Sequence, residues 1–427
     1  MPFDEGAWLE LQDWVSQLRG LPLLRPVPLV QLDPDAFRAR QAEVYRAYLD
    51  PADLERTGQL LVGLGLLDPD DDLASLLVDL YSALPIGFYD PLDGVIYARA
   101  SADPQGPLER VILAHEFTHA LQDQHFGVLH LYQPGSANAD RDQAVSALLE
   151  GDALIVQEMY VATTQPDSPE EQAVQAQAYQ QSLQQVYVEA RQALPFPIEA
   201  VPQPVIQQVY APYLDGPGFI HEVVGTPALT TFGAYGPAVE RLFRRPPQST
   251  AEILHPDKYR RGWRPTPVEL PDLTDALGGD WRLLRHQVIG ELEHRSLLAR
   301  DLPPDEAEAA AAGWAGNRAE ALVDDAGQMA TVSATRWESV DAAATWASAF
   351  AAAIAARYGD AATLLWSEQG RQIWRAADQA VLLEVQDARS LVVQAPTVDD
   401  AEALADAAQA HRPPDLRATL ARLLPVP

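Results

Sequence analysis

The chain contains no cysteine, and this absence excludes disulfide bonds and thiolate metal ligands. Its 427 residues include three methionines and a single lysine, Lys258, so arginine supplies almost all of the positive charge. With a net charge of −31, the chain lacks the basic surface that binds nucleic acid or anionic membranes. We therefore expect neither of these as a partner.

Long apolar runs are also missing. No stretch approaches the roughly 18 apolar residues that a membrane-spanning helix needs. The first residues, Met1 to Glu5, lack the basic region followed by an apolar core that marks a signal peptide. The sequence therefore predicts no membrane span, and it leaves location open between the cytoplasm and secretion after loss of a leader.

Against these absences stands one pentapeptide, His-Glu-Phe-Thr-His at residues 115 to 119. On a helix, residues four apart lie on the same face, so His115 and His119 can present two imidazole nitrogens to one metal ion. Glu116 lies beside them, where a carboxylate can deprotonate a water held by that metal. The pattern predicts a zinc site with Glu116 as the general base.

The surrounding residues favour a buried helix. Asp103 or Gly106 can cap it, and a proline falls in its first turn. Apolar side chains then follow on nearly every side, which is typical of a helix inside a protein. Two buried histidines flanking a glutamate would be costly without a cation to balance the carboxylate.

A catalytic zinc ion usually has three protein ligands and one open position, so a third ligand is needed. His125 lies six residues after His119, but an unbroken helix through residues 120–124 would carry it along the axis, away from the metal. Glu150 lies in an apolar helical run, where Glu150-Gly151-Asp152 is a local conflict of the kind that marks function. We predict Glu150 as the third ligand, with Asp152 as a substitute or as a group that orients a histidine.

A His-Glu-x-x-His helix followed by a glutamate on a second helix resembles the gluzincins, the thermolysin-like branch of the zinc peptidases. The Asn-Glu-x-x-x-Asp pattern of thermolysin's second ligand helix is absent. The chain resembles more closely a family of uncharacterised bacterial proteins regarded as metallopeptidases. The resemblance rests on residues 115–126, 149–153, 87–90, 246–256 and 313–318, with Ala315 and Asn317 where that family would have Gly and Asp. It implies a zinc-dependent peptidase and a zincin-like fold, and it says nothing of the substrate.

We expect an α+β fold that is predominantly helical, in three regions. Residues 1–84 form a helical region, 85–300 a zincin-like catalytic region and 301–427 a C-terminal α+β domain. Residues 86–99 read as a hairpin just before the metal helix, and a free edge of it could pair with an extended substrate. In the last region, strands at 319–324, 329–335, 372–376, 380–386 and 390–394 alternate with helices at 340–358 and 397–410, which suggests a strand–strand–helix unit used twice.

The predicted function is a zinc-dependent hydrolase, most simply a peptidase, in which His115, His119 and Glu150 bind Zn²⁺ and Glu116 activates the zinc-bound water. Its partner would be a peptide or protein substrate. The candidates for stabilising the oxyanion are Tyr213, His221, His255 and Tyr259, and the sequence does not choose between them. Two alternatives stay open: a binding protein in which the metal is structural, and a zinc amidase or esterase acting on small molecules.

Overall fold

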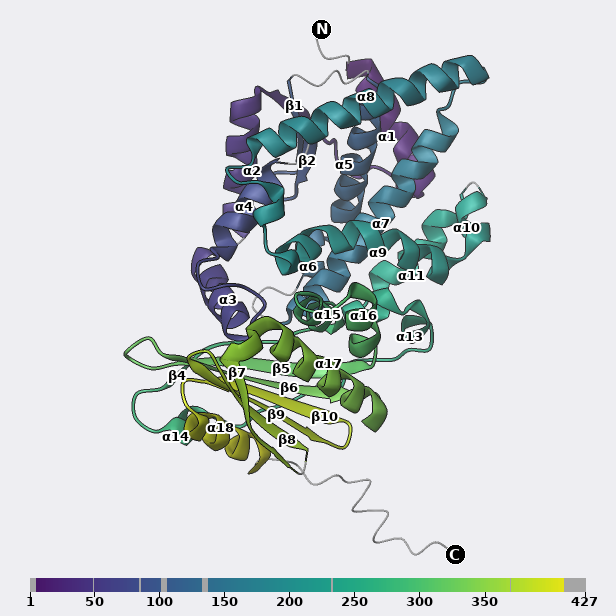
Figure 1. Ribbon diagram of the computed structural model, residues 1–427. Helices are drawn as coiled ribbons and strands as arrows, with labels where there is room; N and C mark the ends of the chain where they lie inside the picture. The colour runs from purple at the N-terminus through teal and green to yellow at the C-terminus, as the bar shows by residue number, and fades with distance from the viewer. Residues whose placement is uncertain are drawn as a thin grey trace, which may run out of the picture. The chain divides into compact units, whose positions relative to one another are not determined.

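A computed structural model describes residues 5–48, 50–83, 86–100, 106–132, 137–231, 233–368 and 370–410 (Figure 1). The chain has an α+β fold that is predominantly helical and contains two sheets, as the sequence predicts. It divides into two compact units: Met1–Gln59, Leu66–Pro265 and Gly290–Leu297 make up unit 1, and Leu60–Gly65, Thr266–Ile289 and Leu298–Pro427 make up unit 2. Unit 1 thus joins most of the region 1–84 to the helices that follow it.

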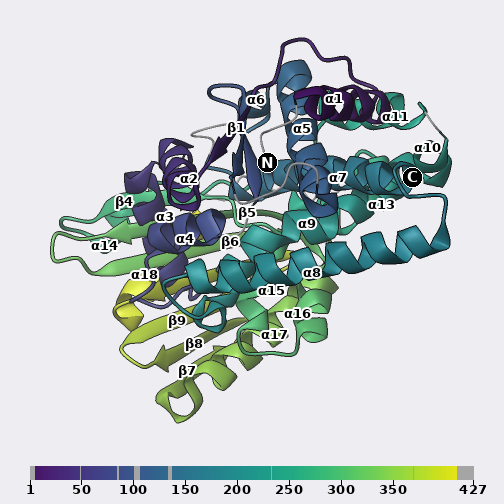
Figure 2. The ribbon, with the colours of Figure 1, turned by 90° about the horizontal axis from the view of Figure 1, so that it is seen from above.

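Unit 1 is built mainly of helices (Figure 2), among which α5 packs against α1, α6, α7 and α8. Its helices are α1 (Glu5–Arg19), α2 (Pro34–Tyr48), α3 (Pro51–Gly63), α4 (Leu73–Ala83), α5 (Pro107–Phe126), α6 (Val128–Leu131), α7 (Ala139–Thr163), α8 (Pro169–Ala193), η1 (Ile198–Ala200), α9 (Gln203–Val224), α10 (Thr226–Thr230), α11 (Tyr235–Arg244), α12 (Thr250–Leu254) and α13 (Pro256–Arg260). The start of α15 (Glu291–Ala299) also belongs to this unit. The core gathers apolar side chains from α1, α5, α7, α9 and α11, so α5 is surrounded by protein, as its sequence predicts.

A three-stranded sheet in unit 1 precedes the central helix. The expected hairpin is confirmed: β2 (Gly87–Asp90) pairs antiparallel with β3 (Val95–Arg99). The turn between them uses Gly94 at a φ of +72°, a left-handed conformation that glycine adopts without strain. A third strand, β1 (Leu29–Leu32), pairs parallel with β3 and was not expected from the sequence. The strand order β1-β3-β2 leaves β2 at an edge.

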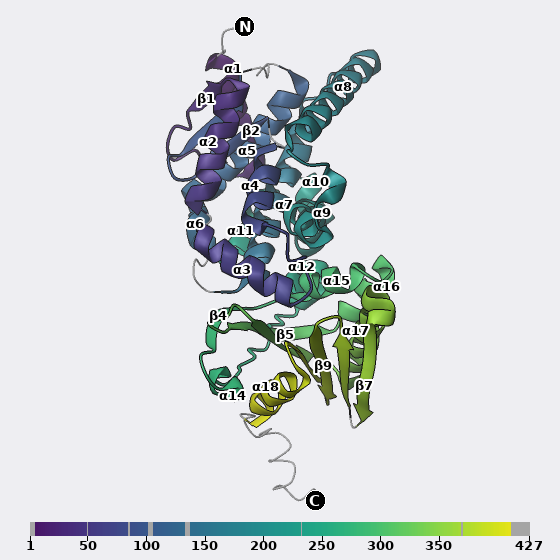
Figure 3. The same cartoon turned by 60° about the vertical axis from the view of Figure 1, so that its left-hand side comes forward.

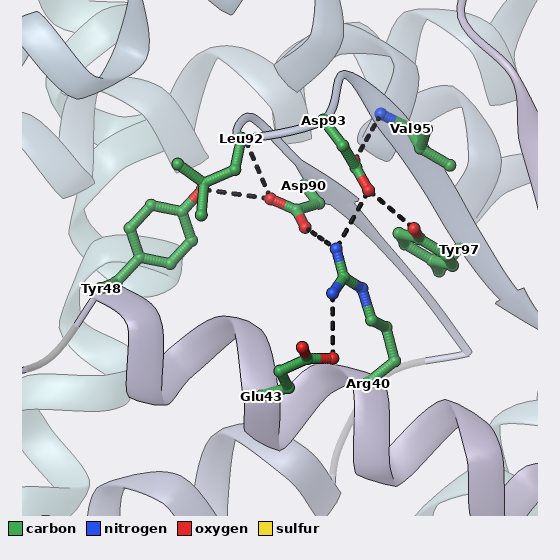
Figure 4. Close-up of polar contacts among 8 residues, drawn as sticks. All are labelled: Arg40, Glu43, Tyr48, Asp90, Leu92, Asp93, Val95 and Tyr97. Atoms are coloured by element: carbon green, nitrogen blue, oxygen red, sulfur yellow. Dashed lines mark hydrogen bonds and ion pairs between the residues drawn. The ribbon is translucent and has the colours of Figure 1, made fainter.

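The hairpin turn is tied to α2 by a network of charges (Figure 4). Arg40 donates hydrogen bonds to Glu43, to Asp90 over 2.8 Å and to Asp93 over 3.0 Å. The buried carboxylate of Asp90 also accepts from the Tyr48 hydroxyl and the Leu92 backbone N–H, while Asp93 accepts from Tyr97 and Val95. Because each carboxylate takes several donors, α2 and the turn are held in one arrangement.

Unit 2 is a seven-stranded antiparallel sheet with helices on both faces (Figure 3). Its elements are α14 (Thr274–Leu277), β4 (Arg282–Gln287), α16 (Pro304–Ala311), β5 (Trp314–Val323), β6 (Met329–Trp337), α17 (Val340–Tyr358), η2 (Gly359–Ala361), β7 (Ala362–Glu368), β8 (Arg371–Ala376), β9 (Gln379–Gln386), β10 (Arg389–Ala395) and α18 (Val398–Ala410). The helix α18 packs on the face that carries Val332 and Leu382, whereas α17 packs on the other face through Trp346 against Trp337.

The strand order of this sheet, β4-β5-β6-β10-β9-β8-β7, is almost symmetric about β6 and β10. Strands β4, β5 and β6 are followed by α17, and strands β8, β9 and β10 are followed by α18. The helices α15 and α16 lie between β4 and β5, and β7 precedes β8, so the strand–strand–helix repeat suggested by the sequence stays a prediction. Strands β4 and β7 carry weak alternation, with exposed side chains along much of their length, which explains why the sequence did not predict them.

Candidate metal centre

Helix α5 carries both histidines of the pentapeptide. It begins at Pro107 after the N-cap Gly106 and ends where Gly127 adopts a φ of +65°, so the predicted proline start is confirmed. Asp103, the other predicted cap, lies outside the described residues. His115 and His119 lie one turn apart and point the same way, with their ring centroids separated by 4.7 Å.

Helix α7 brings Glu150 to these histidines. The helix starts at the N-cap Asn138, whose side chain accepts a hydrogen bond from the Arg141 backbone N–H. Gly151 lets α7 approach α9 very closely, because a Cβ atom there would lie 2.5 Å from the backbone carbon of Gly216. The three residues of the Glu150-Gly151-Asp152 segment thus point in different directions: Glu150 faces the histidines, Gly151 faces α9 and Asp152 faces the core. Each polar side chain in this apolar run therefore has a partner.

The three predicted ligands converge on one point. Nε2 of His115 and Nε2 of His119 are 3.0 Å apart, and Oε2 of Glu150 lies 3.1 Å from the first and 3.4 Å from the second. Among the described residues, this is the group of His, Asp or Glu side chains whose ligand atoms lie close enough to share a metal ion. Their side chains are 10, 14 and 19% exposed, so the group is largely shielded from solvent but still accessible to it.

Electrostatics favour a cation at this point. Burial alone would lower the pKa of His119, but the carboxylate of Glu150, together with Glu116 and the hydrogen bond to Gln122, raises that pKa to about 9. Burial would likewise raise the pKa of Glu150, yet the charge and hydrogen bonds of His119 and His115 hold it well below its usual range. The negative charge of Glu150 therefore favours positive charge at this point, and a metal cation would supply it.

Glu116 points toward the edge strand of the small sheet. Its Oε2 accepts a hydrogen bond of 2.9 Å from the Tyr89 backbone N–H in β2. Burial raises the pKa of Glu116, while His115 and His119 act in the opposite direction. A carboxylate with a raised pKa, held beside two imidazoles that are predicted metal ligands, is suited to accept and return a proton.

Gln122 and Asp152 support His119 from behind. Nδ1 of His119 lies 2.9 Å from the amide oxygen of Gln122, and the amide nitrogen of Gln122 donates to Oδ2 of Asp152 over 2.9 Å. Asp152 is fully buried and does not reach the ligand cluster. The position of Asp152 does not fit a substitute ligand, and its contact with the cluster runs through Gln122.

The other predicted residues lie elsewhere, with one exception. His125 remains on the unbroken α5 and its Nε2 contacts the Pro22 carbonyl oxygen over 2.7 Å, so it takes no part in the cluster. His255 pairs with Glu291, and the Tyr259 hydroxyl donates to the Arg245 carbonyl. The exception is Tyr213 of α9, whose ring lies 6.5 Å from that of His115, nearly parallel to it.

The sequence did not identify Tyr89 or Gln122 as part of the centre. Gln122 could have been found, because it follows His119 by three residues and so shares its face of the helix. Tyr89 acts through its backbone N–H, for which a sequence carries no residue-specific signal. Only the packing of β2 against α5 brings it to Glu116.

Comparison with known proteins gives one finding. Residues 282–405, from β4 to α18, match a Domain of unknown function (DUF8575); the matched segment lies in unit 2 except for Gly290–Leu297, which belong to unit 1. Neither the curated proteins nor the solved structures gave a match. The residues of the candidate centre all lie outside the matched segment. No helix among the described residues is long and apolar enough to span a membrane.

Proposed function

We propose that this protein is a zinc-dependent hydrolase, and most simply a peptidase, with a zincin-like centre in unit 1. The observation that carries the proposal is the triangle formed by Nε2 of His115, Nε2 of His119 and Oε2 of Glu150, with sides of 3.0, 3.1 and 3.4 Å. In tetrahedral zinc sites with ligand distances near 2.0 to 2.1 Å, neighbouring ligand atoms lie about 3.3 Å apart. The three atoms therefore fit one face of such a site.

The number of ligands supports a catalytic site. A structural zinc site has four protein ligands, whereas a catalytic one has three and an open position. In the part of the chain that the structure describes, the cluster has three members. Bound there, zinc would supply Lewis acidity toward water and toward a carbonyl oxygen. These points favour a hydrolase over a protein in which the metal only joins two helices.

Glu116 is the general base in this proposal. Its carboxylate lies one residue from His115, and the Tyr89 N–H occupies Oε2, so Oε1 is the oxygen assigned to proton transfer. Glu116 takes a proton from the attacking water and returns it to the leaving group, which is an amine when the substrate is a peptide. The raised pKa that burial gives this carboxylate brings it closer to neutral pH, where such a transfer is most efficient.

Tyr213 is the donor that we assign to the developing oxyanion. Of the four candidates in the sequence, it is the one whose ring lies against a predicted ligand. Desolvation and the negative charge of Glu150 raise its pKa well above the usual value, so its hydroxyl stays protonated and able to donate. With 40% of the residue exposed, Tyr213 is also accessible to a substrate.

Pairing of the substrate with β2 stays a prediction. The strand lies at the edge of its sheet and beside α5, as an edge strand that binds a peptide should. However, the Tyr89 N–H is already used by Glu116, and Gly87 lies against the Cγ atom of the same residue. A peptide would therefore pair with only part of this edge.

The decisive experiment compares the wild-type protein with Glu116→Gln. Both would be loaded with zinc, their zinc content measured, and both incubated with a mixed peptide library that is analysed by mass spectrometry. We expect one zinc per chain in both proteins, cleavage by the wild type, and a loss of about 10²- to 10⁴-fold in rate for the variant. Equal cleavage by the two proteins would refute the base assignment, and cleavage of ester or amide compounds but no peptide would favour the small-molecule hydrolase.

A further inference from the structure

A buried chain of polar side chains leads from the end of α1 to His119. Nε of Arg19 donates to Oδ2 of Asp152 over 2.8 Å, the amide nitrogen of Gln122 donates to the same oxygen over 2.9 Å, and the amide oxygen of Gln122 faces Nδ1 of His119 over 2.9 Å. Arg19, Asp152 and Gln122 are each 0% exposed. The chain joins three helices, α1, α7 and α5, to one predicted metal ligand.

The contacts of Gln122 fix which end of its amide faces His119. Its nitrogen donates both to Oδ2 of Asp152 and to the Leu149 carbonyl oxygen, which lies 3.0 Å away. Both partners are acceptors, so the NH₂ group belongs on that side and the oxygen belongs on the side of His119. An amide oxygen only accepts hydrogen bonds, so Nδ1 of His119 carries a hydrogen, and Nε2 is the nitrogen that faces the cluster.

Asp152 can hold the amide in this way because it acts purely as an acceptor. Besides Arg19 and Gln122, the Tyr235 hydroxyl donates to its other oxygen, Oδ1, over 2.7 Å. All three of these partners are donors, so both oxygens of this buried carboxyl group act as acceptors. The charge of Arg19 balances it, and the Phe126, Tyr235 and Phe243 rings lie 6.0, 5.8 and 5.3 Å from the Arg19 Cζ atom.

The cost of burying this ion pair points to a role beyond stability. Taking two charges out of water costs several kcal/mol per ion, and well-packed apolar residues of similar size often stabilise a core as well or better. Here the Arg19–Asp152 pair instead orders the one amide that contacts His119. We propose that Arg19, Asp152 and Gln122 are positioning residues that hold His119 in the form with hydrogen on Nδ1 and so set the affinity of the centre for zinc.

The inference rests on the proposed zinc site but not on hydrolysis, because metal binding tests it. In Gln122→Met, a side chain of similar length offers Nδ1 only a weak thioether acceptor, and we expect zinc to bind about 10- to 100-fold more weakly in competition with a chelator. Gln122→Glu restores an oxygen opposite Nδ1, and its protonated oxygen can still donate to Asp152. We expect this variant to bind zinc within a few-fold of wild type.

Tyr235→Phe is the matched control. It removes a buried hydrogen bond from the same network, but at Oδ1, whereas Gln122 is held by Oδ2. Its thermal unfolding temperature should fall while its zinc affinity stays at the wild-type value. If Gln122 had a merely structural role, zinc affinity would fall in proportion to the loss of stability in both Gln122→Met and Tyr235→Phe.

A second readout is the ring hydrogen itself. In the cobalt-substituted protein, a hydrogen on Nδ1 of a metal-bound histidine gives a strongly shifted proton resonance. Gln122→Met should accelerate the exchange of the His119 ring hydrogen with solvent. The exchange rate of the His115 ring hydrogen should stay unchanged, because Nδ1 of His115 has no hydrogen-bond partner among the described residues. If Gln122→Met kept the zinc affinity and the exchange rate of the wild type, the positioning role of Arg19, Asp152 and Gln122 would be overturned and the metal site would stand. If the wild-type protein failed to bind zinc, the proposed metal site would be overturned as well.

Discussion

Tyr89 is joined to helix α5 at two points, and one of them is the predicted general base. Its backbone N–H donates to Oε2 of Glu116 over 2.9 Å, and its hydroxyl donates to Oδ2 of Asp123, two turns further along the helix, over the same distance. The position of strand β2 therefore fixes the direction in which Glu116 points. Because a backbone N–H cannot be removed by an ordinary substitution, the effect has to be tested through the residues that hold the hairpin.

Arg40→Met should loosen that hairpin. The substitution leaves the fully buried carboxylate of Asp90 without its ion-pair partner (Figure 4). Because 27% of the Arg40 side chain is exposed, water would screen part of the charge, and we expect a loss of about 2 kcal/mol in unfolding free energy, below the range for fully buried pairs. Urea unfolding of the metal-free protein measures it. Arg38→Met, which removes an exposed pair with Asp35 on the same helix, should cost less than about 1 kcal/mol. Equal losses of unfolding free energy in the two variants would contradict the stabilising role of the Arg40–Asp90 ion pair.

Glu150→Ala should abolish tight zinc binding. It removes one of three ligand atoms and leaves two imidazoles, so we expect affinity to fall by more than the roughly 100-fold that losing a supporting contact costs. Equilibrium dialysis with zinc would measure the change. His125→Ala is the control, since that residue contacts the Pro22 carbonyl and lies away from the cluster. Full zinc binding by Glu150→Ala would exclude Glu150 as a ligand.

Tyr213→Phe should slow turnover without changing the metal site. Loss of one donor to a developing oxyanion typically reduces kcat by about 10²- to 10³-fold, with little effect on KM. The peptide that the wild type cleaves best serves as substrate, and zinc content is measured in parallel. Tyr259→Phe loses a hydroxyl that bonds to the Arg245 carbonyl instead, so its kcat should stay close to wild type. A wild-type kcat in Tyr213→Phe would remove the hydroxyl from the mechanism.

His294 should lower the unfolding free energy of the protein as the pH becomes acidic. Burial lowers its pKa from 6.5 to about 4, although the hydrogen bond from Nδ1 to the Gly290 carbonyl oxygen acts against that change. Between these values the unfolded chain binds the proton and the folded chain does not, so the stabilisation is present above pH 6.5 and is lost as pH falls toward 4. At pH 4.5 the loss due to this residue should be about 2 to 3 kcal/mol.

The test compares wild type with His294→Gln, whose amide can donate to Gly290 without titrating. Urea unfolding at pH 7.5 and pH 4.5, on metal-free protein, gives the free energies. The wild type should lose more stability than the variant between the two values. The opposite sign would show that the folded state binds this proton.

The sequence by itself determined the local part of the centre. Residues four apart on a helix share a face whatever surrounds them, so a helix over residues 107–126 necessarily places His115 and His119 side by side. The hairpin before α5 and the strands β5, β6, β8, β9 and β10 follow from short-range alternation and turn residues in the same way. Glu150 was found because a charged residue in an apolar helical run needs a compensating partner.

Tertiary structure alone decided how these residues are supported. Arg19 reaches Asp152 across 133 positions in the chain, and Tyr89 reaches Glu116 across 27. No periodicity links such positions, because their contact depends on how whole helices and strands pack. The same holds for β1, whose pairing partner β3 is far away in the chain, and for the ring of Tyr213 against His115. The sequence placed two predicted ligands and a predicted base on one helix and pointed to Glu150 as the third ligand; packing brought Glu150 to the histidines and selected the donors and acceptors around them.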